Sequence, residues 1–223
     1  MEKSYKYRIY PNQQQEELIQ KTFGCSRFVY NYYLAKRIEI YKQDKSTISC
    51  YDCFKDLKNI KQEFSWLKEV DITALRSSLN NLDYAYQNFF RRVKSGDSKV
   101  GFPKFKSKKN NHKSYKTKMS SNNIRVLDKY IKLPKLGMVK CKVSKQIEGR
   151  ILNVTISQNP SSKYFVSVCC TDVKTPKLEL TGAIVGIDLG IKEFAITSDN
   201  KHIENPKYFR KSEKKLAKLQ REL

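Results

Sequence analysis

Long hydrophobic runs are missing from this chain of 223 residues. No stretch approaches the roughly 20 apolar residues that a membrane span needs, and the opening residues lack the apolar core of a signal peptide. We therefore expect a cytoplasmic protein with no membrane partner. The hydrophobic fraction of 39% and aromatic fraction of 12% are too high for a disordered basic tail, so a folded chain is expected.

Patterns for disulfides and bound zinc are also scarce. The six cysteines are interpreted as reduced thiols, because no secretory signal accompanies them. Cys50 and Cys53 have the spacing of a zinc-binding pair, but a structural zinc site needs a second pair, which the sequence does not contain. Neither His112 nor His202 belongs to a catalytic motif. The sequence therefore predicts no zinc site and no catalytic histidine.

Acidic residues are few compared with basic ones, 22 against 45, and the net charge is +23 at pH 7. Residues 89–118 hold eleven basic side chains and the single acidic residue Asp97. Such segments neutralise phosphates and release counterions, and aromatic rings within them allow bases to stack. Nucleic acid is therefore the expected partner. The predicted phosphate contacts are Arg91, Arg92, Lys94, Lys104, Lys106, Lys108 and Lys109.

Residues 12–95 show the spacing of a helical bundle. A strand is predicted over 4–10, and a capping box of Asn12 and Gln15 starts a helix that Gly24 is expected to end at residue 23. Apolar side chains at three- and four-residue spacing predict three further helices. These cover residues 25–41, 49–64 and 71–95, of which the last is the longest and is capped by Asp71.

Residues after 96 change character and favour short strands. A polar basic loop at 107–111 is followed by five β-rich runs separated by turn residues. The runs cover residues 124–127, 130–133, 138–143, 151–157 and 164–170. They predict a small β-barrel that the N-terminal strand joins.

Asp188 is the strongest candidate for a chemical role. Residues 183–197 are typical of a buried strand, a tight turn and a returning strand, and an acid among apolar neighbours is costly to bury unless it binds a cation or a hydrogen-bonding cluster. Its oxygens suit Mg²⁺ or Mn²⁺. The layout indicates an RNase H-like fold, in which such an Asp holds metal for phosphodiester cleavage. The alternative is an Asp that merely stabilises the turn.

Four motifs follow one another along the chain: YKYRIYP at 5–11, FGCSRFVYN at 23–31, GFPKFK at 101–106 and GIDLGIK at 186–192. In this order they resemble the TnpB (OrfB) proteins of bacterial insertion sequences. The resemblance implies an α+β multidomain protein: a small wedge β-barrel interrupted by a helical domain and followed by an incomplete RuvC-like (RNase H-like) α/β domain. The implied boundaries are 1–11 and 97–172 for the wedge, 12–96 for the helical recognition domain, 173–183 for a linker and 184–223 for the RuvC-like start.

The same resemblance implies a transposon-associated, RNA-guided DNA endonuclease. Its partners would be a guide RNA and target DNA, and Asp188 would be the first carboxylate of a Mg²⁺- or Mn²⁺-dependent RuvC site. The Glu, the second Asp and the four-cysteine zinc module that the resemblance implies downstream are absent from these residues. We therefore expect a C-terminally truncated or split member that does not cleave alone and is completed by a separately encoded C-terminal fragment.

Other interpretations remain open at this point. A cleavage-dead relic or regulator that binds RNA or DNA has the same sequence features. The string Gly186-Ile187-Asp188-Leu189-Gly190 also opens actin-like ATPases and sugar kinases, although there it lies near the N-terminus. Glu193 is close enough along the chain to act as a second metal ligand, but a surface acid paired with Lys192 or Lys201 is the simpler interpretation.

Overall fold

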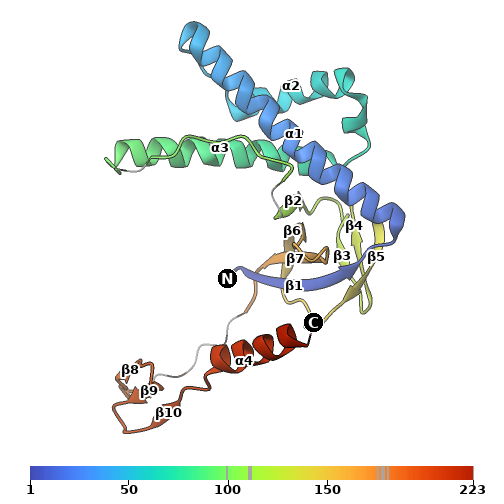
Figure 1. Ribbon diagram of the computed structural model, residues 1–223. Coiled ribbons are helices and arrows are strands. Elements are labelled where there is room, and N and C mark those ends of the chain that lie inside the picture. Colours follow the sequence, from blue (N-terminus) through green and yellow to red (C-terminus); the bar gives the residue numbers. More distant parts are fainter. Residues whose placement is uncertain (99, 110–111, 175, 177–178, 180, 223) are drawn as a thin grey trace. The chain divides into compact units, whose positions relative to one another are not determined.

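The computed structural model describes residues 1–98, 100–109, 112–174, 176, 179 and 181–222, which form two compact units (Figure 1). The first unit, Met1–Thr175, contains three α-helices and a seven-stranded sheet, and the second, Pro176–Leu223, contains a three-stranded sheet and one helix. This mixed composition confirms the predicted α+β class. None of the helices within these described ranges combines the length and apolar character needed to cross a membrane.

The elements follow one another in the order strand, helices, strands. The first unit consists of β1 (Lys3–Tyr10), α1 (Gln13–Asp44), α2 (Cys50–Glu63), a 3-10 turn (Ser65–Lys68), α3 (Ile72–Lys94), β2 (Lys113–Lys118), β3 (Arg125–Val126), β4 (Tyr130–Leu133), β5 (Gly137–Lys142), β6 (Arg150–Gln158) and β7 (Tyr164–Thr171). The second consists of β8 (Ile187–Asp188), β9 (Glu193–Thr197), β10 (His202–Glu204) and α4 (Tyr208–Arg221). The predicted linker at 173–183 lies partly outside the described residues.

Helix α1 is unbroken over 32 residues, so the prediction that it ends at Gly24 is wrong. The predicted capping box of Asn12 and Gln15 is present at its start. Phe23 and Val29, on either side of the glycine, are buried. Burying such side chains contributes about 1.5–3 kcal/mol each, which exceeds the roughly 1 kcal/mol that a glycine costs inside a helix. The helix predicted over 25–41 is therefore the second half of α1, and α1 is longer than α3.

Helix α3 begins at the predicted cap residue Asp71, and α2 begins at Ser49, the first residue of its predicted range, which the structure shows to be a cap. Ser49 forms a capping box with Asp52, and the Asp71 side chain accepts a hydrogen bond of 3.0 Å from the backbone N–H of Thr73. Apolar side chains of the three helices pack into one core, which includes Val29, Leu34, Leu57, Leu67, Leu75 and Leu79. Figure 1 shows α1, α2 and α3 gathered together beside the strands of the same unit.

Strand β1 lies in the middle of the large sheet. The strand order is β2-β6-β7-β1-β5-β4-β3, and β1 pairs antiparallel with both β5 and β7. Strands β2 and β3 stand at opposite edges, so a closed barrel remains a prediction. The sequence pattern did not predict β2, whose buried residues Tyr115 and Thr117 alternate with lysines.

Gly149 occupies a position in this sheet unit that only glycine fits. Its φ is +79°, and an added Cβ would overlap the carbonyl oxygen of Thr171. We expect Gly149→Ala to lower the free energy of unfolding by about 1–3 kcal/mol in urea titrations. Gly101→Ala is the matched control, because nothing lies within 4 Å of its added Cβ, and it should change stability by less than about 0.5 kcal/mol. Equal effects of the two variants would contradict this explanation.

Candidate nucleic-acid interface

A cleft of about 180 Å³ opens where α1, α3 and β2 meet in the first unit. We call it the basic cleft, because four cationic side chains line it together with neutral polar ones. The cations are Arg27, Lys106, Lys113 and Lys116, and the polar residues include Ser26, Ser78 and Asn81. The cleft contains no carboxylate among its described lining residues. It therefore presents a positive surface with hydrogen-bonding groups between its charges.

Hydrogen bonds between helices and sheet hold the walls of the basic cleft in place. The Ser78 hydroxyl of α3 donates to the backbone carbonyl of Ser26 in α1 at 2.6 Å. Asp71, the cap of α3, also accepts a hydrogen bond from the Thr117 hydroxyl of β2. One carboxylate thus fixes the start of α3 and joins it to the edge of the sheet.

The floor of the basic cleft is aromatic and buried. The rings of Phe23 and Tyr115 meet edge to face with centroids 5.7 Å apart. Burial raises the pKa of the Tyr115 hydroxyl above its usual range, and the nearby charge of Asp71 adds to this shift. Tyr115 is therefore a neutral, rigid support for Lys113 and Lys116 on either side of it in β2.

The loop before β2 is tied to α1 by the Asn31 side chain. Asn31 donates from Nδ2 to the Lys106 carbonyl at 3.0 Å and accepts from the Lys106 backbone N–H at 2.8 Å. The Lys106 ammonium lies 4.1 Å from the centre of the Tyr30 ring. Lys106 is exposed by total surface area, but its crowded ammonium is desolvated, which lowers its pKa. The loop cation nearest the cleft is thus fixed in position.

The basic cleft suits a phosphodiester backbone. Several cations on a fixed scaffold can neutralise successive phosphates, and serine and asparagine side chains commonly donate to phosphate oxygens or read base edges.

The seven phosphate contacts predicted from sequence occupy three places. Lys106 lines the basic cleft, and Lys104, Lys108 and Lys109 are exposed in the loop that carries it. The remaining three, Arg91, Arg92 and Lys94, are exposed in the last turn of α3. The sequence pattern did not single out Arg27, Lys113 or Lys116, although Arg27 lies in the motif at 23–31 and the two lysines lie in the most basic segment.

Asp188 lies in the small sheet of the second unit and is exposed. The prediction of a buried strand is wrong for the described residues: Ile187 is 61% exposed and Leu189 is 70% exposed. The physical reason is that this unit's described elements bury very little, with no buried residue in α4. Asp188 lies opposite Ile196 in the strand pairing, and Ile196 lies opposite His202, so the three residues share one face of the sheet.

Glu193 pairs with a histidine and not with the predicted lysines. Its Oε2 lies 2.6 Å from Nδ1 of His202, whose Nε2 lies 3.1 Å from Oδ1 of Asn200. The described residues contain no group of three or more His, Cys, Asp or Glu side chains that could hold a metal ion. One carboxylate opposite an isoleucine does not by itself fit a two-metal centre, which needs several carboxylates around the ions.

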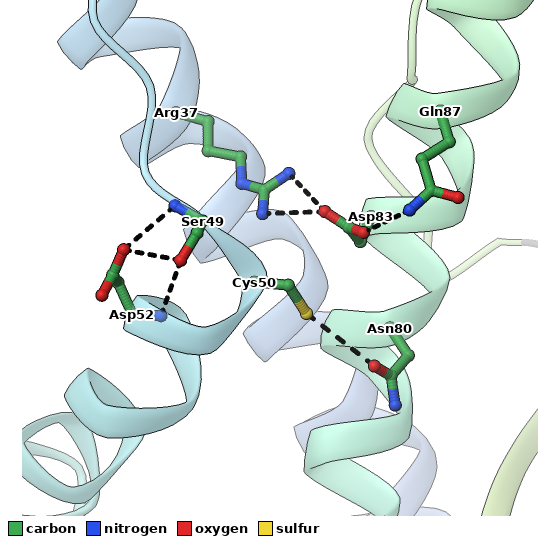
Figure 2. Close-up of polar contacts among 7 residues, drawn as sticks. All are labelled: Arg37, Ser49, Cys50, Asp52, Asn80, Asp83 and Gln87. Carbon is green, nitrogen blue, oxygen red and sulfur yellow. Dashed lines mark hydrogen bonds and ion pairs between the residues drawn. The ribbon is translucent and has the colours of Figure 1, made fainter.

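The CxxC pair lies on α2 within the helical core. Cys53 is buried and Cys50 is half-buried, and burial raises the pKa of both thiols. The Cys50 thiol lies 3.8 Å from Oδ1 of Asn80 and donates to it (Figure 2). Cys53 is part of the core of the three helices, and Cys50 packs against that core.

Two family models match separate parts of this chain. Residues 1–46 match the helix-turn-helix domain model of the OrfB proteins of the IS605 type, and residues 167–223 match the model described as the probable transposase of that type. Within the first match the structure has one strand and one unbroken helix.

Two curated relatives align along the entire chain. It is 33% identical over 227 residues to the Escherichia coli protein "Putative RNA-guided DNA endonuclease InsQ", covering 99% of this chain and 53% of that protein. It is 31% identical over 228 residues to the Streptomyces pristinaespiralis protein "Putative RNA-guided DNA endonuclease", covering 100% of this chain and 54% of that protein. The chain thus spans about half the length of these relatives. A solved Cas12f1-sgRNA-target DNA complex has a TM-score of 0.40 and 14% identity, covering 99% of this chain and 61% of that one.

Proposed function

Because the chain belongs to the TnpB (OrfB) family of transposon-encoded proteins, we propose that it forms the nucleic-acid-binding part of an RNA-guided DNA endonuclease. It binds a guide RNA and target DNA. The basic cleft is the observation that carries this proposal, since Arg27, Lys106, Lys113 and Lys116 come from three elements to one rigid surface. The names of the two curated relatives support the same proposal.

In this proposal the predicted phosphate contacts extend the basic cleft along the loop that carries Lys106 and toward the end of α3. In this proposal a nucleic-acid backbone crosses the cleft, follows the loop cations at Lys104, Lys108 and Lys109, and reaches the basic end of α3. Arg91, Arg92 and Lys94 lie in that last helical turn, and none of them forms an ion pair with a carboxylate of the described residues. Contacts of this kind position a strand without reading its sequence.

The domain boundaries predicted from sequence are part of the proposal. Residues 1–11 and 97–172 form the wedge domain, which is supported by the pairing of β1 with β5 and β7. Residues 12–96 form the recognition domain between them, and residues 184–223 begin a RuvC-like domain. The boundary near 173–183 agrees with the division of the chain into two units.

Asp188 is proposed as the first metal ligand of that RuvC-like domain. Further carboxylates for Mg²⁺ or Mn²⁺ come from polypeptide outside these residues, including a separately encoded C-terminal fragment where one exists, and the chain alone does not cleave DNA. The large exposed fractions of Ile187, Leu189, Phe209 and Leu216 support this, because apolar side chains at such exposure call for additional covering structure.

The salt dependence of binding tests the proposal. The logarithm of the association constant for a structured RNA should fall linearly with the logarithm of the salt concentration, with a slope of about −4 or steeper. A fluorescence anisotropy titration at several salt concentrations measures this slope. Binding without salt dependence, or ATP turnover in the absence of nucleic acid, would contradict the proposal and favour an actin-like ATPase.

A further inference from the structure

A second and larger pocket lies in the first unit, away from the residues of the basic cleft. Its volume is about 630 Å³, which is within the size range of sites for small organic ligands. We call it the aromatic pocket, because five aromatic rings from α1, α3 and the following loop line it. These rings belong to Tyr41, Tyr86, Phe89, Phe90 and Phe102.

The rings present flat surfaces to solvent. Tyr86 and Phe90 are stacked with centroids 6.3 Å apart and an angle of 24° between their planes. Phe102 meets Phe89 edge to face at 5.3 Å. Despite these contacts Phe90 is 60% exposed and Tyr41 is 57% exposed. Exposed rings beside a pocket offer stacking faces that accept any nucleobase.

One wall of the aromatic pocket is polar, and its Arg37, Asp83 and Gln87 side chains contact one another (Figure 2). Arg37 has a side chain only 6% exposed, and its terminal nitrogens lie 3.3 and 3.4 Å from Oδ1 of Asp83. Gln87 donates to the other oxygen of Asp83 at 2.8 Å. The Nε of Arg37 is buried without a hydrogen-bond partner among the described residues. The wall thus combines carboxylate, amide and guanidinium groups, the kinds that pair with base edges.

The rim of the aromatic pocket carries positive charge. Lys42 and Lys45 line it, and the Lys45 ammonium lies 5.2 Å from the centre of the Tyr41 ring. A ligand that places a flat ring in the pocket and an anionic group at its edge therefore matches the site. A nucleotide within a strand has both features, whereas an apolar peptide side chain carries no anionic group for the two lysines to contact.

We propose that the aromatic pocket captures an unpaired nucleobase, which stacks on Phe90 and Tyr41 while Lys42 and Lys45 contact its flanking phosphates. This inference rests on the proposed function, since it assumes that nucleic acid is the partner. It adds a site that distinguishes an unpaired nucleotide from a continuous duplex. The cations of the basic cleft do not by themselves make this distinction, because both forms present backbone phosphates.

The test compares a duplex that carries one bulged 2-aminopurine with a fully paired duplex of the same length, each made as RNA and as DNA. The wild-type chain should bind the bulged probe about tenfold more tightly and change its fluorescence, because 2-aminopurine emission responds to the stacking of the base. The double variant Tyr41→Ala/Phe90→Ala should lose both the preference and the fluorescence change. Its affinity for the paired duplex should stay within about twofold of wild type. Comparing the RNA probes with the DNA probes shows which kind of nucleic acid supplies the base.

Two further variants keep the test decisive. Tyr41→Leu/Phe90→Leu retains apolar volume without flat rings and should behave like the alanine variant, which separates stacking from a folding defect. Tyr51→Ala removes a ring that is 66% exposed on α2 outside the pocket, and it should behave like wild type. An unchanged preference in the ring variants would overturn the nucleobase assignment and leave the pocket to an apolar peptide. If wild type binds neither probe, the proposed function fails and this inference fails with it.

Discussion

A variant without the four cations of the basic cleft is expected to bind a structured RNA about 100-fold more weakly than wild type near physiological salt. It carries the substitutions Arg27→Ala, Lys106→Ala, Lys113→Ala and Lys116→Ala. These cations contact one backbone in the proposal, so the loss combines four phosphate contacts with the counterions that each contact releases. The slope of the salt dependence should become about 3 units less steep.

A charge-matched variant separates the cleft from net charge. Lys55, Lys58, Lys61 and Lys68 belong to α2 and the turn that follows it, and none of them lines the basic cleft. Replacing these four with alanine removes the same charge but should weaken binding less than about tenfold. Thermal unfolding of both variants checks that each is folded. Equal losses of affinity would show that charge alone, and not the cleft, determines binding.

Asp188→Ala is expected to reduce DNA cleavage by about 100-fold or more in a completed protein, because losing a metal ligand costs more than the 10- to 100-fold lost with its outer-shell partners. The completed protein joins this chain to the part of the Escherichia coli relative that the chain does not cover. The 223-residue chain alone should leave matched DNA intact in Mg²⁺. RNA affinity should stay within about twofold, since Asp188 is not among the residues of the basic cleft.

A neighbouring acid provides the control for Asp188. Asp199 is exposed between β9 and β10 of the same unit, and Asp199→Ala should leave cleavage unchanged. Cleavage by the 223-residue chain alone that disappears with Asp188→Ala would contradict the proposal that further ligands are required. A completed protein that binds RNA but never cuts would favour a binding-only relic or regulator.

The sequence predicted the helix ends that depend on neighbouring residues. Asn12 and Asp71 satisfy backbone N–H groups two or three residues away, so their positions alone indicate where α1 and α3 begin. The continuation of α1 through Gly24 could not be predicted in this way. It depends on burial against elements that are distant in sequence, which outweighs the local preference of glycine.

The candidate site was only partly predictable for a related reason. The excess of lysine and arginine in residues 89–118 is visible in the sequence, and it pointed to the segment that contributes three of the four cleft cations. Arg27 joins them only because α1 packs beside α3 and β2, a contact that no local pattern encodes. The pairing of Glu193 with His202 likewise follows from the register of β9 and β10.

The central place of β1 has a consequence for how the protein is made. Its partners β5 and β7 are translated long after it, with Arg8 opposite Lys142 and Tyr7 opposite Val166. Contacts so distant in sequence give a high contact order and slow formation of the sheet. During synthesis, α1, α2 and α3 can assemble on the ribosome before β5 and β7 are available to pair with β1. The nascent chain therefore carries a folded helical part and an unpaired strand with one apolar face, Tyr5, Tyr7 and Ile9, for much of its translation. Chaperones that bind extended segments should engage it near the N-terminus.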